Sequence, residues 1–365
     1  MSATFALVTG GGTGGHVYPA LALADELVAR GHHRDSVRFV GSARGLETSV
    51  VPAAGYTIDV LPGRGLDRSR SLRALARNAR TAVDTVVAFA RAWRIVRRYR
   101  PAVVVGVGGY ASLPALVAGR MQRIPAVVHE ADAHPGLANR IAVRLGAHAA
   151  VSLPGTSLPR AVVTGNPIRP EIVAVRRAPV TPPVVAVVGG SLGAQRVNDA
   201  ALGLAERWRA RGDVVIHHVS GTRGYEECRR RLVATRAPTD RLDYRLVPYE
   251  EHMEDLYTDA TVMVSRSGGM TAELAAVGMP SVLVPLPGAP GDHQTRNADV
   301  FAGAGAGVMV PDAELDADRL AAELDRLLAD PARLGAMSDA ARTLGRPDAA
   351  ARFADLVEEV ARGRR

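Results

Sequence analysis

Lysine is absent from this chain of 365 residues. All 45 basic residues are arginines, and they outnumber the 37 acidic residues to give a formal net charge of +8. The missing lysine excludes a Walker-type phosphate loop, a Schiff base to a substrate or to pyridoxal phosphate, and the lysine-dependent short-chain dehydrogenases. A genome-wide preference for arginine over lysine is the simplest explanation of this bias, and the chemical exclusion holds whatever its origin.

Cysteine, aromatic residues and long apolar runs are also scarce. The single cysteine, Cys228, cannot form an intramolecular disulfide, which is typical of a reducing compartment. We find no signal-peptide pattern and no apolar stretch near the roughly 18 residues of a membrane span, so we expect a cytoplasmic protein. Aromatic residues make up only 4% of the chain, and with no recognised module this argues against nucleic acid as a partner.

Short apolar runs that alternate with helical patterns are abundant. Runs such as "AVVVGVGG" and "PVVAVVGG" are nearly continuous, which is typical of parallel strands covered on both faces. The proline-rich "RRAPVTPP" at 176–183 separates two such series. We therefore predict an α/β protein with two Rossmann-like, doubly wound parallel-sheet domains, 1–168 and 169–349. We expect a helix at about 350–365 to pack back on the first domain.

Two glycine-rich loops each follow an apolar strand. The first contains Gly10-x-Gly12-x-x-Gly15, and "GGSLGA" repeats the arrangement in the second half. A nicotinamide-binding domain should end its second strand in an acidic residue, but here that strand ends in Gly41 and Ser42. The dehydrogenase interpretation is therefore disfavoured. Backbone amides at a helix start still bind anions, and two such loops suit a diphosphate between the domains.

Six motifs occur in a specific order along nearly the whole chain: "GGTGGHVYPALALA", "GVGGYASLPALVAG", "HEADAHPGLANR", "TGNPIR", "GGSLGAQRVND" and "GDHQTRNA". In order and spacing they resemble the MurG family of peptidoglycan N-acetylglucosaminyltransferases. The resemblance implies a GT-B fold, with two domains facing a cleft. It also implies inverting transfer of N-acetylglucosamine from UDP-N-acetylglucosamine to lipid I, forming lipid II, without a metal or cofactor.

The resemblance also implies which residues form the site. An inverting transfer needs a base for the acceptor hydroxyl and stabilisation of the departing diphosphate. His16 matches the proposed base, although a histidine at a helix start can also simply pack there. The donor-binding set is Thr13, Gly14, Gly15, Asp132, Arg169, Ser191, Glu250, Glu273 and Gln294. The acceptor and phosphate loops contribute Gly12, Gly109, Tyr110, Glu130 and Asn139.

Individual roles follow for four of these residues. Arg169 and Ser191 match contacts to the donor diphosphate, Glu273 matches the carboxylate on the ribose hydroxyls, and Gln294 matches the amide on the sugar hydroxyls. Without the resemblance, Arg169 is an ordinary surface arginine and Gln294 an ordinary polar residue at a helix start. We expect no metal site, because the only Asp-x-Asp, at 316–318, is typical of the first turn of a helix.

The chain departs from the family pattern at three places. Asp132 stands where the family has an asparagine, so a group that only accepts replaces one that also donates. The segment from Arg266 to Glu273 is one residue short, and Glu250 replaces an isoleucine that presents its backbone to uracil. A backbone contact tolerates the change at Glu250. The first two departures keep two alternatives open: a paralogue with another glycolipid or natural-product acceptor, and a catalytically weakened sugar-nucleotide sensor or assembly protein.

The segment 68–100 carries an amphipathic pattern. Apolar residues recur every three or four positions at Leu72, Leu75, Ala79, Ala82, Val86, Phe89 and Trp93. Arginines occupy the neighbouring face of the same predicted helix. This predicts either a core-facing helix with a solvated basic face or a helix on an anionic membrane surface. The resemblance favours the inner membrane surface as a partner, and other cell-wall synthesis proteins are further candidate partners.

Overall fold

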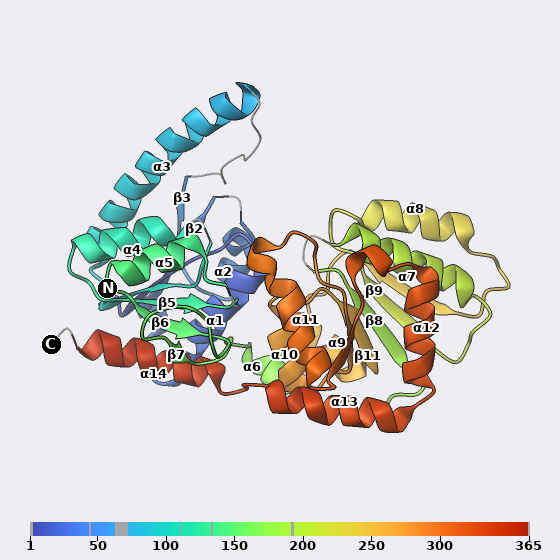
Figure 1. The fold of residues 1–365 in the computed structure, drawn as a ribbon. Coiled ribbons are helices and arrows are strands. Elements are labelled where there is room, and N and C mark those ends of the chain that lie inside the picture. The colour runs from blue at the N-terminus through green and yellow to red at the C-terminus, as the bar shows by residue number, and fades with distance from the viewer. Residues whose placement is uncertain are drawn as a thin grey trace. The chain divides into compact units, whose positions relative to one another are not determined.

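A computed structural model describes residues 3–43, 45–62, 72–109, 111–132, 134–190 and 193–363, with the backbone alone for 72–83 and 290. The chain forms two compact units (Figure 1). Unit 1 comprises Met1–Arg169 and Pro347–Arg365, and unit 2 comprises Pro170–Arg346. Tyr110 and Ser191, two of the expected site residues, lie outside the described residues.

Unit 1 is built on a parallel sheet with the strand order β3-β2-β1-β4-β5-β6-β7 in the described residues. The strands are β1 (Ala6–Thr9), β2 (Val37–Ser42), β3 (Ile58–Leu61), β4 (Val103–Gly106), β5 (Ala126–Glu130), β6 (His148–Val151) and β7 (Val162–Val163). β1, β4 and β5 are fully buried, as their continuous apolar sequences predict. Strand order reverses between β1 and β4, and ligands of such sheets bind at this switch point.

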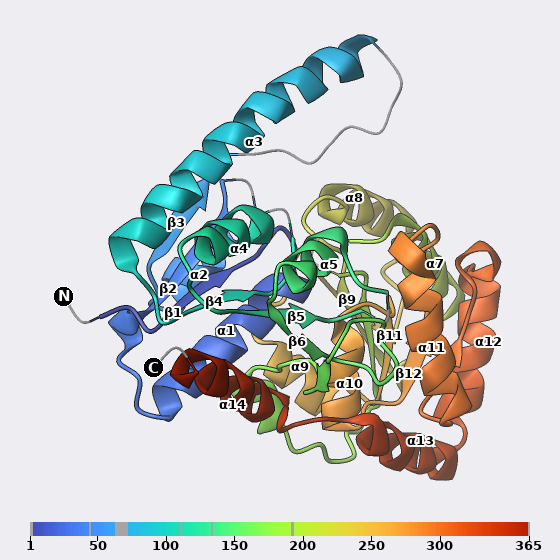
Figure 2. The same ribbon diagram turned by 60° about the vertical axis from the view of Figure 1, so that its left-hand side comes forward.

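Helices cover both faces of this sheet: α1 (Gly14–Ala29), α2 (Glu47–Ala53), α3 (Leu72–Tyr99), α4 (Ser112–Met121), α5 (Leu137–Arg144) and α14 (Ala349–Arg362). α14 packs beside α1 (Figure 2). The Arg30 guanidinium lies 2.6 Å from the Asp355 carboxylate and 3.4 Å from that of Glu358. Phe353 and Val357 are fully buried in the same core as α1. The end of the chain thus completes the unit that begins it.

The amphipathic segment forms the single long helix α3, which projects from unit 1 in Figures 1 and 2. Of the predicted apolar stripe, the side chains of Leu72, Leu75, Ala79 and Ala82 lie outside the described residues. Trp93 packs against the core as predicted, but Val86 is 69% exposed, whereas Ala88, Ala92 and Ile95 are buried. The small side chains of Ala88 and Ala92 allow α3 to approach α4 closely. The packed face of the helix is therefore centred beside the predicted apolar stripe and leaves Val86 outside it.

Unit 2 contains a second parallel sheet with the described order β10-β9-β8-β11-β12-β13. The strands are β8 (Val184–Val188), β9 (Val215–Val219), β10 (Asp243–Val247), β11 (Val262–Ser265), β12 (Ser281–Leu283) and β13 (Gly307–Met309). The helices are α6 (Pro170–Val173), α7 (Gln195–Arg207), α8 (Tyr225–Thr235), α9 (Met253–Asp259), α10 (Met270–Val277), α11 (His293–Gly303), α12 (Ala317–Leu328) and α13 (Pro331–Leu344). Its switch point lies between β8 and β11.

Arg177 fixes the proline-rich segment to unit 2. Its guanidinium donates to the carbonyls of Gly278, Ala260 and Thr261, which follow the ends of α10 and α9. Burial lowers the pKa of Arg177 to about 10. The C-terminal end of a helix carries partial negative charge, so the carbonyls at the ends of α9 and α10 stabilise this buried cation.

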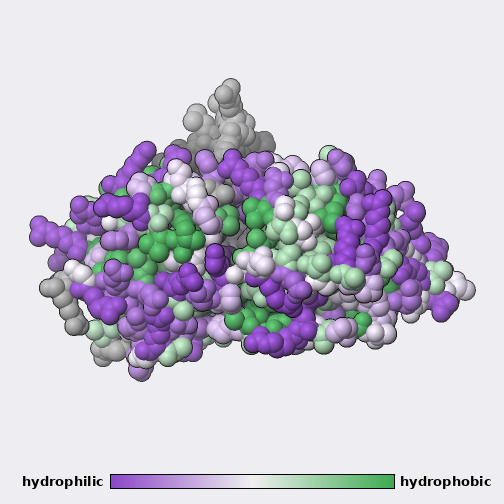
Figure 3. Space-filling view, turned by 60° about the horizontal axis from the view of Figure 1, so that its bottom comes forward, coloured by the Kyte–Doolittle hydropathy of each residue, from purple (hydrophilic) through white to green (hydrophobic). Residues whose placement is uncertain are grey.

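The face drawn in Figure 3 is largely hydrophilic, with hydrophobic side chains gathered in smaller patches. Among the described residues, no helix combines the length and the apolar composition of a bilayer span.

Candidate active site

The first glycine loop of unit 1 joins β1 to α1 and touches the loop that follows β4. Gly11 and Gly12 have φ values of 148° and 97°, which side chains rarely adopt. A Cβ on Gly109 would lie 2.4 Å from the Gly11 carbonyl oxygen, and one on Gly10 would lie 2.8 Å from the Gly108 oxygen. The two loops are therefore in backbone contact, and side chains at these positions would separate them.

His16 lies in the first turn of α1 and is half-buried. Its Nδ1 is 3.2 Å from the Gly11 carbonyl oxygen. A carbonyl can only accept, so Nδ1 carries the hydrogen and the neutral ring keeps the Nε2 lone pair. A Cβ on Gly108 would lie 2.9 Å from Nε2, which places the ring over the second loop. Nε2 is therefore the ring nitrogen that can accept a proton.

The start of α1 offers polar groups beside this imidazole. Gly12, Thr13 and Gly15 are exposed, and Gly14 is half-buried. Thr13 occupies the N-cap position in an extended conformation without a capping hydrogen bond from its side chain. Amides at the start of this 16-residue helix face the positive end of its dipole, which suits an anionic group.

Arg169 ends the long segment of unit 1 and lies over α1. Its guanidinium carbon is 4.5 Å from the centre of the Tyr18 ring, two residues after His16. Such a cation–π contact favours a guanidinium held flat against the ring. The structure thus brings His16, the glycine loop and Arg169 to one end of α1.

The "HEAD" motif follows β5, and its glutamate holds the following loop. The Glu130 carboxylate is buried and accepts from the N–H groups of Asp132 (3.1 Å) and Gly136 (2.8 Å). It also accepts from Nδ2 of Asn139 at 2.9 Å. Burial raises the pKa of Glu130. Glu130 and Asn139 therefore shape the loop that carries Asp132, which is half-buried.

His129 precedes Glu130 and is also buried. Its Nε2 donates to the Gly165 carbonyl at 3.1 Å, and its ring lies 5.1 Å from the Phe353 ring of α14. Burial lowers the pKa of His129 to about 4, so the ring is neutral at pH 7. Because its side chain is only 1% exposed, inside the core of unit 1, His129 is poorly placed to act as a base on a bound substrate.

In unit 2, Glu273 lies in the first turn of α10. It is half-buried, and its Oε2 accepts from the Tyr257 hydroxyl at 2.6 Å. Tyr257 is fully buried in α9 and can hold the carboxylate in one orientation. Sequence reasoning missed Tyr257, because it lies 16 residues away without a motif of its own.

Gln294, in α11, is half-buried and tied to neighbouring loops through its oxygens. Its side-chain Oε1 accepts from the Leu286 N–H at 2.9 Å, and its backbone oxygen accepts from the Ser267 hydroxyl at 2.7 Å. Asn297 in turn donates to the Ser267 carbonyl at 2.9 Å. Since the amide oxygen is committed, Gln294 is oriented to act through its NH₂ group as a donor.

Glu250 follows β10, and its side chain faces β9. Its Oε2 lies 3.2 Å from Nε2 of His217, and its Oε1 accepts from the His252 N–H at 3.2 Å. Burial lowers the pKa of His217 despite this carboxylate. Both side chains are half-buried at the same sheet edge, so the acidic residue found here has a partner within the fold.

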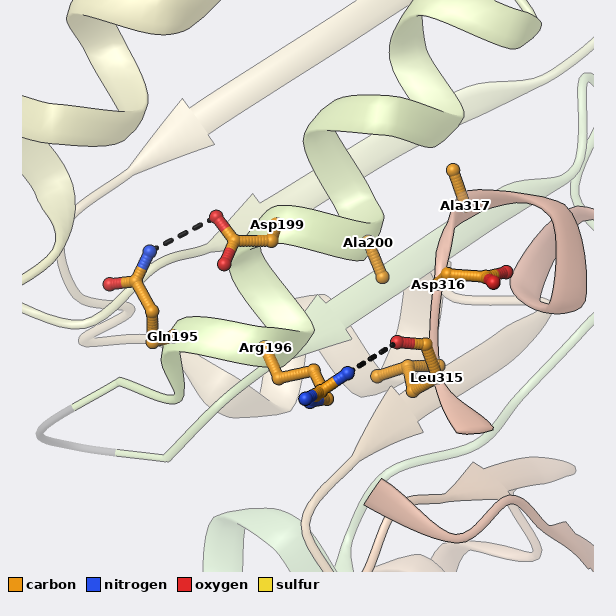
Figure 4. Close-up of a pocket in the computed structure, with 7 residues that line it drawn as sticks. All are labelled: Gln195, Arg196, Asp199, Ala200, Leu315, Asp316 and Ala317. Atoms are coloured by element: carbon orange, nitrogen blue, oxygen red, sulfur yellow. Dashed lines mark hydrogen bonds between the residues drawn. The ribbon is translucent and has the colours of Figure 1, made fainter. Parts of the chain in front are cut away.

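The second glycine loop packs on the end of β9. Gly190 and Gly193 have φ values of 91° and 80°, and a Cβ on Gly193 would lie 2.2 Å from the Ser220 carbonyl oxygen. This loop leads into α7, where a cavity of about 490 Å³ lies between α7 and α12 (Figure 4). Its lining side chains bond within the fold: Gln195 donates to Asp199, and Arg196 donates to the Leu315 carbonyl (Figure 4).

One further feature was not expected from the sequence. Glu47, in α2, is buried against the first glycine loop. Its partner there is 35 residues away, and no local pattern marks a single glutamate after "GL" as buried.

Within the described ranges, no group of three or more His, Cys, Asp or Glu side chains is placed to hold a metal ion.

Comparison with known proteins assigns both units. The model of the glycosyltransferase family 28 N-terminal domain matches residues 6–151, and that of the C-terminal domain of this family matches residues 184–359. A relative from Alkalilimnicola ehrlichii is 42% identical over 98% of this chain and 99% of its own length. One from Clavibacter michiganensis is 40% identical over 99% and 98%. Both are named UDP-N-acetylglucosamine–N-acetylmuramyl-(pentapeptide) pyrophosphoryl-undecaprenol N-acetylglucosamine transferase.

Solved structures show the same fold. The crystal structure of MurG from Acinetobacter baumannii has a TM-score of 0.73 and 26% identity, covering 98% of this chain and 99% of that one. The glycotransferase of kitacinnamycin has a TM-score of 0.69 at 18% identity, covering 99% and 100%, and this likeness concerns the fold alone. The predicted fold class, two parallel-sheet α/β domains of the GT-B type, is confirmed.

Proposed function

Because this chain belongs to the MurG family within glycosyltransferase family 28, we propose that it transfers N-acetylglucosamine from UDP-N-acetylglucosamine to lipid I, forming lipid II. The observation that carries this proposal is the 42% identity, over 98% of the chain, to a relative named for that reaction. The enzyme is a hexosyltransferase of peptidoglycan synthesis, and its substrates are a nucleotide sugar and a lipid-linked sugar.

We propose His16 as the catalytic base. As the acceptor hydroxyl attacks the anomeric carbon, its proton passes to Nε2 of His16, and the bond between that carbon and the UDP oxygen breaks. Attack opposite the leaving group inverts the anomeric centre. The contact of Nδ1 with the Gly11 carbonyl supports this role, because it leaves Nε2 as the basic nitrogen.

The departing diphosphate needs compensation of its charge. We propose that Arg169 and the amides at the start of α1 stabilise phosphate groups in this region, since a guanidinium and a helix N-terminus both favour anions. In unit 2, we propose that Glu273 binds the ribose hydroxyls and Gln294 donates to the sugar. We propose that these protein groups stabilise the leaving diphosphate without a metal ion, in keeping with the family.

We also propose that the protein works at the cytoplasmic face of the membrane as a peripheral protein. Lipid I is a membrane lipid, so the acceptor side of the enzyme must reach the bilayer surface. α3 supports this location: Val86 and Val87 are 69% and 48% exposed, and Arg91, Arg94 and Arg98 are exposed nearby. An amphipathic basic helix of this kind binds anionic lipid surfaces.

The test is UDP release by the purified full chain with lipid I as acceptor. We expect His16→Ala to lower kcat by roughly 10²–10⁴ while the affinity for UDP-N-acetylglucosamine stays close to that of the wild type, because the base acts only in the chemical step. His33→Ala is the matched control, since the side chain of His33 is 71% exposed in the same unit.

Parallel assays with other glycolipid acceptors test the substrate assignment. Faster turnover with another acceptor would replace lipid I, and equal losses of donor binding and turnover in His16→Ala would make His16 a binding or structural residue. Activity that disappears with a chelator would contradict the metal-independent reaction.

A further inference from the structure

Glu47 is a buried carboxylate surrounded by glycine backbone. It is 2% exposed and lies in the first turn of α2. Built on Gly11, Gly41 or Gly45, a Cβ would lie 2.2, 2.5 or 1.9 Å from atoms of the Glu47 side chain. The cradle therefore exists only because these three positions lack a side chain, and it is shaped for this carboxylate.

Three donors compensate the buried charge. Oε1 accepts from the backbone N–H and from the hydroxyl of Ser42, both at 2.8 Å. Oε2 accepts from the Gly12 N–H, also at 2.8 Å. A buried carboxylate persists only when such bonds replace its hydration, so these contacts fix its orientation.

The peptide group between Gly11 and Gly12 connects this carboxylate to the imidazole. Its N–H donates to Glu47, and its C=O accepts from Nδ1 of His16 at 3.2 Å. The two ends of a trans peptide point in opposite directions, so a single planar unit lies between the two side chains. A carboxylate on the N–H polarises the amide and makes its oxygen a stronger acceptor.

We propose that Glu47 is a positioning residue for His16, acting through the Gly11–Gly12 peptide. This Glu47 relay holds the hydrogen on Nδ1 and keeps the Nε2 lone pair toward the acceptor. It also stabilises the imidazolium that forms when Nε2 takes a proton. The logic is that of a carboxylate that orients a catalytic histidine, with one peptide group inserted. The inference rests on His16 as the base of the proposed function.

The relay makes a direct prediction for the wild-type protein. In the full chain labelled with ¹⁵N-histidine, long-range ¹H–¹⁵N spectra at pH 8 should show His16 as the Nδ1–H tautomer. Its signals are identified by their loss in His16→Ala. Finding the Nε2–H tautomer in the wild type would overturn the relay without any Glu47 variant having to fold.

Glu47→Gln breaks the relay with little change in shape. Ser42 offers two donors, so the amide oxygen should turn toward Ser42 and leave the NH₂ group facing the Gly12 N–H. We expect the Nδ1–H tautomer to lose its dominance and kcat to fall by about 10–100-fold, the usual effect of removing an orienting partner. The KM for UDP-N-acetylglucosamine should stay within about twofold of the wild-type value, because none of the residues proposed to bind the donor is altered.

Ser49→Ala is the matched control. Ser49 lies in the same helix, is exposed, and donates its hydroxyl to the Leu46 carbonyl at 3.0 Å, so the tautomer and kcat should remain near those of the wild type. Thermal unfolding of both variants tests whether unit 1 is intact. If Ser49→Ala shifts the tautomer and kcat as much as Glu47→Gln does, the effect comes from a general disturbance of α2 and the relay is refuted.

Unchanged tautomer and kcat in a folded Glu47→Gln variant would likewise refute the relay. The tautomer measurement is independent of turnover. A fully active His16→Ala enzyme with an Nδ1–H wild-type ring would therefore overturn the catalytic role of His16 and leave the Glu47 relay standing as a structural feature.

Discussion

At the scale of single residues, the side chains proposed to bind the donor differ in which part of the nucleotide sugar they would contact. Glu273 is held by the Tyr257 hydroxyl and is proposed to face the ribose, which UDP and UDP-N-acetylglucosamine share. Gln294 is held through its oxygen and is proposed to face the sugar, which UDP lacks. Substitution of Glu273 should therefore weaken the binding of both ligands, whereas substitution of Gln294 should weaken the binding of UDP-N-acetylglucosamine alone.

We expect Glu273→Ala to weaken binding of both UDP and UDP-N-acetylglucosamine by about 1–3 kcal/mol, because buried hydroxyls lose their acceptor. Gln294→Ala should weaken the binding of UDP-N-acetylglucosamine alone. Calorimetry without added metal measures all four affinities. Tyr257→Phe is the control: it removes the hydroxyl that orients Glu273 and should have a smaller effect. Equal losses for both ligands in Gln294→Ala would exclude a contact with the sugar.

The local part of this site could be predicted from the sequence, and the long-range part could not. A strand, a glycine loop and a helix with His16 in its first turn are adjacent in the chain, so their pattern determines their order in space. Glu47 and Tyr257 meet their partners across 35 and 16 residues. Such contacts depend on how separate elements pack, and a single sequence carries no signal for them.

At the scale of elements, α3 shows where periodicity helps and where it does not. The repeat correctly predicted one long helix. It identified the packed side only in part: Trp93 packs against the core, but Val86 is exposed, and the buried Ala88 and Ala92 contribute little to an apolar pattern yet allow close contact between helices. Val86 and the exposed arginines of α3 do not pack within unit 1, so they are available to contact a membrane surface.

We therefore expect the protein to bind vesicles that contain anionic lipids and to release them as salt rises, because the range of surface charge shortens to about 10 Å at 0.1 M. Arg91→Glu with Arg94→Glu should weaken this binding in a sedimentation assay. The matched control is Arg229→Glu with Arg230→Glu, on the exposed face of α8 in unit 2. Binding that ignores salt, or equal loss in the control pair, would argue against α3 as the membrane contact.

At the scale of the whole molecule, buried histidines link stability to pH. His218 is fully buried in unit 2, where its Nε2 donates to Oδ1 of Asn198 at 3.0 Å and its Nδ1 accepts from the Tyr244 hydroxyl at 2.7 Å. Burial lowers the pKa of His218 to about 3, against 6.5 for an exposed histidine. Between these values the unfolded chain binds one more proton than the native protein, so stability falls as pH falls.

From pH 7 to pH 5, this proton should lower the free energy of unfolding of unit 2 by about 2 kcal/mol. His218→Gln should remove that contribution, since an amide can keep both hydrogen bonds without titrating. Urea unfolding followed by Trp208 fluorescence in a Trp93→Phe background reports on unit 2 alone, because the chain has two tryptophans. The same pH dependence in both proteins would contradict the assignment.

The packing of α14 on α1 has a consequence for synthesis on the ribosome. Residues 1–169 emerge before unit 2, yet their core includes Phe353 and Val357, which are made after unit 2. The inserted unit 2 has all of its strands and helices once residue 346 has left the ribosome. Unit 1 is therefore begun before unit 2 but can complete its core only after unit 2 has been made, and its apolar face stays open until α14 has left the ribosome.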